Sequence, residues 1–258
     1  MATISDLHAP SALRLPLGRA SLFLDLDGTL VEFGDDPATI RASSAVQCAL
    51  ARCQASLCGR LAILSGRSIA SVDEVLGGGV VAVAGVHGLQ QRSAVLGVME
   101  TPPHPGIAEV MGTLEVIAKA DRRLRIEPKG QSVAIHFRQA PAAEPAIVEI
   151  VERLAKGAHL EVQYGVMVAE LRTPGPDKGA ALERYMSLPP FAGSKPIFVG
   201  DDLTDESGFV MAQALGGVGI AVGPRAETAA RGRLSNPAAV LSWLNRSLDT
   251  GVFDVADS

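Results

Sequence analysis

Ser21-Leu22-Phe23-Leu24-Asp25-Leu26-Asp27-Gly28-Thr29-Leu30 is the stretch on which the fold depends. A short apolar run leads directly into two carboxylates, and the Asp27-Gly28 pair marks where a strand must end. If Asp25 and Asp27 are still extended, their side chains lie on one face, because a strand alternates with a period of two. Two acids so placed repel each other unless a cation or a shared proton lies between them. The alternative is an ordinary turn in which Asp27 and Gly28 supply only the backbone conformation.

After this stretch, short apolar runs alternate with helical segments. Such a rhythm predicts an α/β fold with a parallel sheet and right-handed crossovers. Serine, aspartate and asparagine stand where helix N-caps are expected, and Gly77-Gly78-Gly79 ends one helix. The expected strands are 21–24, 60–64, 80–84, 195–199 and 219–222, and the expected helices are 44–57, 68–76, one starting at Asp177 and one starting at Asn236-Pro237.

The middle of the chain follows a different pattern. Between the proline-rich stretches 102–106 and 173–176, the order is helix, two strands, helix, two strands, which predicts an α+β unit. We therefore expect a Rossmann-like core interrupted by an inserted α+β cap domain. The predicted limits are 1–101 for the first part of the core, 102–172 for the cap and 173–258 for the second part of the core.

Composition narrows the class of protein. The 258 residues are 47% hydrophobic and carry a formal net charge of −5, so the totals give no attraction to nucleic acid or to acidic membranes. No run approaches the roughly 20 apolar residues of a membrane span, and Met1–Ala20 lacks the apolar core of a signal peptide. We expect a cytoplasmic protein, and the sequence does not determine its oligomeric state. Cys48, Cys53 and Cys58 are interpreted as small core residues or unreactive thiols.

Polar clusters follow three of the predicted parallel strands, and a lysine begins a helix nearby. In an open α/β sheet, ligands bind outside the carboxyl ends of the strands, so these clusters are expected to meet in one crevice. The acids suit a hard cation such as Mg²⁺, and the hydroxyl, lysine and helix N-termini suit a phosphate. The residues are Asp25, Asp27, Ser65, Arg67, Lys178, Asp201, Asp202 and Asp205.

Four motifs in this order resemble those of haloacid dehalogenase-like phosphatases. They are Asp25-Leu26-Asp27-Gly28-Thr29, Ser65, Lys178 and Gly200-Asp201-Asp202-x-x-Asp205. The resemblance implies that Asp25 is the nucleophile, that Asp27 is the general acid and base, and that Asp25, Asp201 and the backbone carbonyl of Asp27 hold Mg²⁺. It also implies that Thr29, Ser65 and Lys178 bind the phosphoryl oxygens, with Asp202 orienting Lys178 and Asp205 the water around the metal.

A second resemblance includes the predicted cap. The order Glu127-x-Lys129-x-x-Ser132-x-x-x-His136-x-Arg138, with Gly85-Val86-His87-Gly88, Ser65-Gly66-Arg67 and Glu170, resembles the trehalose-6-phosphate phosphatases. It implies that Glu127, Lys129 and Glu170 bind the sugar distal to the phosphate. Without it, Glu127 and Lys129 are a solvated turn pair of little energetic weight. His87, His136 and Arg138 are weaker candidates for substrate contact, with a structural role as the alternative for each. Arg67 could contact the cap or the substrate.

The resemblance implies a Mg²⁺-dependent phosphatase that hydrolyses trehalose 6-phosphate, a small-molecule sugar phosphate, through an aspartyl-phosphate intermediate. One alternative is a phosphatase or phosphomutase for another sugar phosphate, such as sucrose 6-phosphate or glucosylglycerol phosphate. An intact Asp27 is compatible with a mutase and with a phosphatase alike. A non-catalytic sugar-phosphate sensor is a further alternative, although a sensor has no need of an intact nucleophile, acid and metal site.

Overall fold

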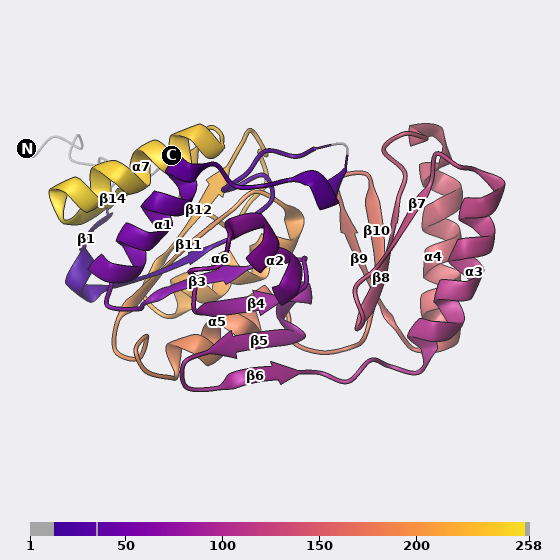
Figure 1. Ribbon diagram of the computed structural model, residues 1–258, viewed down its shortest axis with the longest axis horizontal. Helices are drawn as coiled ribbons and strands as arrows, with labels where there is room; N and C mark the ends of the chain where they lie inside the picture. The colour runs from indigo at the N-terminus through magenta and orange to yellow at the C-terminus, as the bar shows by residue number, and fades with distance from the viewer. Residues whose placement is uncertain (1–12, 35, 256–258) are drawn as a thin grey trace, which may run out of the picture.

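The computed structural model describes residues 13–34 and 36–255, and the larger part of the molecule is built on one eight-stranded sheet (Figure 1). Its strands are β2 (Ala20–Leu24), β3 (Leu61–Leu64), β4 (Ala82–Gly85), β5 (Gln90–Ser93), β6 (Gly97–Glu100), β11 (Lys195–Gly200), β12 (Val218–Val222) and β13 (Gly232–Leu234). The order is β13-β12-β11-β2-β3-β4-β5-β6. The pairs β4–β5 and β5–β6 are antiparallel, and all other neighbouring strands are parallel. The predicted α/β class is confirmed.

Alternation along the central strands builds two separate cores, one on each face of this sheet. In β2, Leu22 and Leu24 belong to one hydrophobic cluster and Phe23 to the other. The first cluster packs under α1 (Ser44–Ser56), α2 (Ile69–Leu76) and α7 (Pro237–Thr250), and the second under α5 (Lys178–Met186) and α6 (Glu206–Ala214). The central strands are therefore buried on both sides, which explains their continuous apolar runs.

The carboxyl ends of three neighbouring strands bring distant residues together. Strand β2 lies between β11 and β3, and the backbone N–H of Asp25 donates to the carbonyl of Val199 at 2.9 Å, just beyond the end of β2. The residue that follows β3 is Ser65, and the residue that follows β11 is Asp201. The predicted polar clusters thus share one edge of the sheet.

The segment between the two halves of the core forms a smaller layer of its own. Its sheet is antiparallel and its apolar residues form a separate cluster between the sheet and two helices. The elements are α3 (Gly106–Ala120), β7 (Arg125–Pro128), β8 (Ser132–His136), α4 (Glu144–Ala158), β9 (Glu161–Gly165) and β10 (Val168–Arg172), with the strand order β7-β8-β10-β9. Figure 1 shows this sheet facing the core, with α3 and α4 on the side away from it. We call residues 106–172 the inserted unit; the predicted domain limits stay predictions.

Two connections join the inserted unit to the core, and they lie side by side. The backbone N–H of His104, on the way in, donates to Thr173 Oγ1, on the way out, at 3.0 Å. Thr173 in turn donates from its backbone N–H and its hydroxyl to the carbonyl of Gln131, at 2.9 and 2.7 Å. The chain therefore enters and leaves the inserted unit at neighbouring points.

The sequence does not predict strands β5 and β6, because neither carries the apolar pattern of a strand. Strand β5 reads Gln-Gln-Arg-Ser, and all four residues of β6 are exposed at the sheet edge. A short pair of β1 (Leu13–Pro16) and β14 (Val252–Val255) was also unforeseen, as were β13 and α6.

Three further expectations concern leader, membrane and thiols. Most of the segment in which we expected no signal peptide lies outside the described residues. Among the described helices, none is long and apolar enough to cross a membrane. Cys53 packs inside the core, where burial raises the pKa of its thiol to about 12, while Cys48 and Cys58 are exposed. The interpretation of Cys53 as a core residue is confirmed.

Candidate active site

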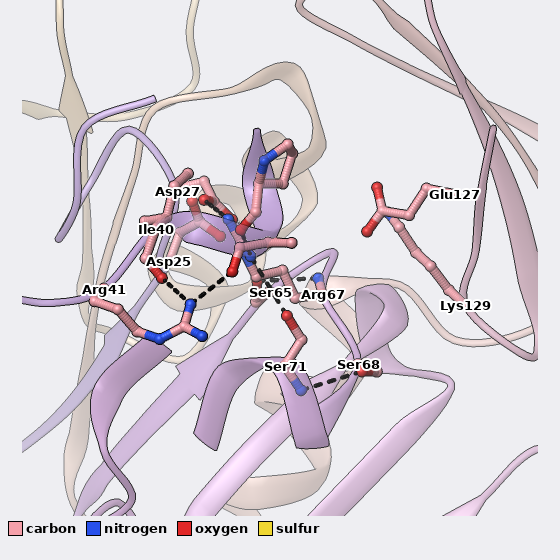
Figure 2. Close-up of polar contacts among 12 residues, drawn as sticks. Asp25, Asp27, Ile40, Arg41, Ser65, Arg67, Ser68, Ser71, Glu127 and Lys129 are labelled. Carbon is pink, nitrogen blue, oxygen red and sulfur yellow. Dashed lines mark hydrogen bonds and ion pairs between the residues drawn. The ribbon is translucent and has the colours of Figure 1, made fainter. Parts of the chain in front are cut away.

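A cleft of about 810 Å³ separates the carboxyl edge of the core sheet from the sheet of the inserted unit. Side chains from both units line it, and Glu127 and Lys129 lie across the gap from the Asp25, Asp27 and Ser65 side (Figure 2). The predicted site residues that line the cleft are Asp25, Asp27, Ser65, Arg67, His87, Glu127, Lys129, Glu170, Lys178 and Asp202.

Lys178 is the centre of a buried charge cluster at the floor of this cleft. Its ammonium donates to Asp25 Oδ1 at 2.8 Å and to Asp205 Oδ1 at 2.6 Å. The three side chains are 3%, 7% and 0% exposed. Burial alone would lower the pKa of Lys178, but the two carboxylates hold it well above its usual value, so the lysine stays charged. An ammonium has three N–H donors, and the third is left for a ligand in the cleft.

Asp201 adds a further carboxylate to this cluster, and the residues present fit a divalent cation. Oxygen atoms of Asp25, Asp201 and Asp205 lie within 4.8 Å of one another. Burial, with like charges nearby, raises the pKa of Asp25 well above its usual value and that of Asp201 to about 7. The three carboxylates outnumber the single Lys178 ammonium, and a bound cation would supply further positive charge. The absence of a side chain at Gly28 leaves space for the Asp201 carboxylate, since a Cβ at that position would lie 2.2 Å from Asp201 Oδ2.

The structure gives the two predicted supporting acids, Asp202 and Asp205, partners other than the expected ones, and their expected roles stay predictions. The Asp202 side chain accepts a hydrogen bond from the Leu203 N–H, and within the described residues the hydrogen bonds of the Lys178 ammonium go to Asp25 and Asp205. Besides its bond from Lys178, the Asp205 carboxylate accepts from the backbone N–H groups of Asp201 and Asp202, both at 2.9 Å. The chain turns after Asp201, so that the Asp205 carboxylate lies beside the Asp201 backbone. Asp205, and not the nearer Asp202, therefore reaches Lys178.

Of the three side chains predicted to bind phosphate, Ser65 and Lys178 line the cleft and Thr29 does not. Thr29 is fully buried, and its hydroxyl donates to Asp201 Oδ1 at 3.3 Å. The expected contact between its hydroxyl and a phosphoryl group is therefore not supported by this arrangement. Thr29 instead holds a carboxylate of the acidic cluster.

Asp27 and Arg67 form a two-pronged ion pair on the core side of the cleft. Arg67 Nε donates to Asp27 Oδ2 and Nη2 to Oδ1, both at 2.7 Å. Asp25 and Asp27 are not continuous strand, because β2 ends at Leu24 and Asp27 makes an isolated bridge with Val31. The two acids consequently have different partners: Asp25 pairs with a lysine and Asp27 with an arginine.

Across the cleft, Lys129 pairs with Glu170 and not with its sequence neighbour Glu127. Lys129 Nζ lies 2.7 Å from Glu170 Oε2, and the two side chains are 11% and 6% exposed. Burial alone would raise the pKa of Glu170, but the Lys129 ammonium, with His87, holds it below its usual range. Glu127 instead contacts His136 Nε2 at 2.8 Å. A solvated turn pair is therefore excluded for Lys129.

His87 lies between the core and the Lys129–Glu170 pair. Its Nε2 is 3.6 Å from Glu170 Oε2, and its Nδ1 is 2.7 Å from Nε2 of Gln163, a cleft residue that sequence reasoning missed. Gly66 packs beneath it, since a Cβ at that position would meet the imidazole at 2.6 Å. The Ser65-Gly66-Arg67 motif thus contains a signal for this contact, whereas nothing in the sequence singles out Gln163.

The chain is similar to known phosphatases over most of its length. The family model for "Trehalose-phosphatase" matches residues 23–236. The chain is 34% identical over 226 residues to the trehalose-6-phosphate phosphatase of Escherichia coli K12, covering 86% of this chain and 84% of that protein. It is 32% identical to a probable trehalose-phosphate phosphatase of Sinorhizobium fredii, with 83% and 82% covered.

Solved structures agree on the fold. The C-terminal domain of the C. albicans trehalose-6-phosphate phosphatase superposes with a TM-score of 0.80 at 21% identity, covering 90% of this chain and 92% of that one. A trehalose-6-phosphate phosphatase related protein superposes with a TM-score of 0.70 at 25% identity, covering 89% and 97%. A haloacid dehalogenase-like hydrolase from Bacteroides thetaiotaomicron is also similar, with a TM-score of 0.61 at 20% identity, which agrees with the predicted fold.

Proposed function

Because this chain belongs to the trehalose-phosphatase family, we propose that it hydrolyses trehalose 6-phosphate to trehalose and phosphate with Mg²⁺ as cofactor. One observation carries the proposal. The buried Asp25–Lys178–Asp205 cluster and the buried Lys129–Glu170 pair line the same cleft from opposite sides. The first suits a phosphate beside a cation, and the second offers an ammonium and a carboxylate to sugar hydroxyls.

The core residues divide the reaction into two steps. In the first, a carboxylate oxygen of Asp25 attacks phosphorus, the bond from phosphorus to the sugar oxygen breaks, and Asp27 gives that oxygen a proton. In the second, a water oxygen attacks phosphorus, the bond to Asp25 breaks, and Asp27 takes the proton from the water. Lys178 and Ser65 hold the phosphoryl oxygens throughout. Mg²⁺, held by Asp25, Asp201 and the Asp27 carbonyl, would offset the negative charge between nucleophile and phosphate.

A panel of sugar phosphates, assayed for phosphate release with Mg²⁺ and with EDTA, tests substrate and cofactor together. We expect trehalose 6-phosphate to be the preferred substrate, EDTA to abolish its hydrolysis, and Ca²⁺ to inhibit, because Ca²⁺ accepts larger and looser coordination. Asp201→Ala should lower activity and raise the Mg²⁺ concentration required. Preference for another sugar phosphate would refute the substrate, and full activity after exhaustive chelation would refute the cofactor.

The inserted unit is expected to select the substrate. Replacing Lys129, Glu127 or Glu170 by alanine should cost about 2–4 kcal/mol in kcat/KM for trehalose 6-phosphate, since each removes a charged partner from a largely enclosed site. A small aryl phosphate does not reach these residues, so its hydrolysis should change less than about threefold. Lys156→Ala, an exposed lysine on α4 of the same unit, is the matched control. Equal losses on both substrates would contradict a role in sugar binding.

A further inference from the structure

The pairing of Arg67 with Asp27 shows how the guanidinium is used. Nε and Nη2 reach the two carboxylate oxygens at 2.7 Å each, and Nη1 donates to the Pro37 carbonyl at 2.7 Å and lies 3.4 Å from Ser71 Oγ. These contacts occupy four of the five N–H donors of an arginine. All the partners belong to the core, and the side chain is 8% exposed. Within residues 13–34 and 36–255, no hydrogen bond to Arg67 thus comes from the inserted unit.

The backbone of Arg67 is fixed as firmly as its side chain. Its N–H donates to Ser65 Oγ at 3.1 Å, and its carbonyl accepts from the Val86 N–H at 2.8 Å. A sugar hydroxyl could gain full use of this guanidinium only if the arginine gave up charge-assisted hydrogen bonds, which are the strong ones. Direct contact with the substrate, one of the two roles expected from the sequence, would therefore cost Arg67 these hydrogen bonds.

Asp27 depends on this arginine for its orientation. Its backbone is held in a tight turn, in which the Gly28 N–H donates to the Val31 carbonyl at 2.7 Å. Its side chain is 25% exposed to the cleft, and within residues 13–34 and 36–255 its carboxylate has hydrogen bonds to Arg67 alone. We propose that Arg67 is a positioning residue that sets the Asp27 carboxyl for proton transfer.

The inference rests on the proposed function, in which Asp27 gives a proton to the sugar oxygen and later takes one from water. Proton transfer requires a carboxyl oxygen within hydrogen-bond reach of the reacting oxygen, and a freely rotating carboxyl spends little time there. The hydrogen bonds from Arg67 restrict rotation of the Asp27 carboxyl, while part of that side chain stays exposed to the cleft. Its loss should reduce turnover, whereas the affinity for the sugar, held by other residues, should hardly change.

The decisive experiment is a double-mutant cycle. We expect Arg67→Met to lower kcat for trehalose 6-phosphate about 10²-fold, the range of positioned acid–base catalysis, with KM changed less than about threefold. In an Asp27→Asn background, measured by single turnover with excess enzyme, the same substitution should cost less than about threefold, because residues that act as a unit are not additive. An equal cost in both backgrounds, or a loss confined to KM, would overturn the proposal in favour of a sugar contact.

Two controls separate positioning from support of the fold. Arg92→Met removes another two-pronged pair, with Asp73 at 2.6 and 2.7 Å, outside the cleft, and should leave kcat unchanged. With nitrophenyl phosphate, whose leaving group departs without a proton, Arg67→Met should leave the initial burst of nitrophenol within about threefold of wild type. Loss of the burst would overturn the proposal. If the panel identifies another sugar phosphate, the assigned substrate fails, and the cycle run on that compound still decides the role of Arg67.

Discussion

Asp25→Asn is expected to abolish turnover while leaving the protein folded. The substitution keeps the shape of the side chain but removes the attacking oxygen anion and one candidate metal ligand. We expect a loss of at least about 10³ in kcat, or about 4 kcal/mol of activation free energy. Asp205 remains as a charged partner of the Lys178 ammonium, at 2.6 Å, so we expect the fold to be retained.

The measurement is phosphate release from trehalose 6-phosphate, with circular dichroism and thermal unfolding to verify the fold. Asp73→Asn, which changes an acid of a core ion pair outside the cleft, is purified in parallel and should retain its activity. This preparation also reports contamination by host phosphatase. Turnover of Asp25→Asn within tenfold of wild type would exclude Asp25 as the nucleophile.

Lys178→Met should lower both turnover and stability. The ammonium is the partner of two buried carboxylates, Asp25 and Asp205, and a methionine of similar length leaves their charges uncompensated. Breaking a buried ion pair by removing one partner costs about 3–5 kcal/mol of unfolding free energy. The phosphoryl oxygens also lose a charged hydrogen-bond donor, so we expect kcat to fall by about 10³ or more.

Urea unfolding and initial rates are to be compared for wild type, Lys178→Met and the control Lys195→Met. Lys195 is an exposed lysine at the start of β11, and its substitution should change the unfolding free energy by less than about 0.5 kcal/mol. A destabilisation below about 1 kcal/mol in Lys178→Met would mean that the carboxylates do not need the ammonium. Turnover near that of wild type would contradict its role in binding the phosphoryl group.

The central strands of the core sheet, and the meeting of Asp25, Ser65, Lys178 and Asp201, could be predicted because they follow from local pattern and a rule of topology. Continuous apolar runs such as Leu61–Leu64 identify strands buried on both faces. Parallel strands then place the residues after them at one edge, whatever their separation in sequence. Strand β6 carried no such pattern, because its residues are exposed and pair only with β5.

The choice of partner within the site could not be predicted. The sequence offers Asp202 and Asp205 to Lys178 equally, and the turn that begins at Asp202 determines that Asp205 reaches it. In the same way, Glu127 is nearer to Lys129 in the chain. Lys129 lies in the turn between β7 and β8, and the pairing of β8 with β10 brings Glu170 to it. Side-chain pairing depends on turn geometry and strand register, which composition and spacing leave open.

The hydrogen bond between His104 and Thr173 joins the two ends of the inserted unit, so the unit enters and leaves the core at neighbouring points. Segments with adjacent ends can be gained, lost or exchanged during evolution without cutting the structure that receives them. Asp25, Lys178 and Asp205 all lie outside residues 106–172, whereas Lys129 and Glu170 lie inside. With the proposed roles, mutation within residues 106–172 can change which phosphate ester is bound, while the residues that act on phosphorus stay unchanged.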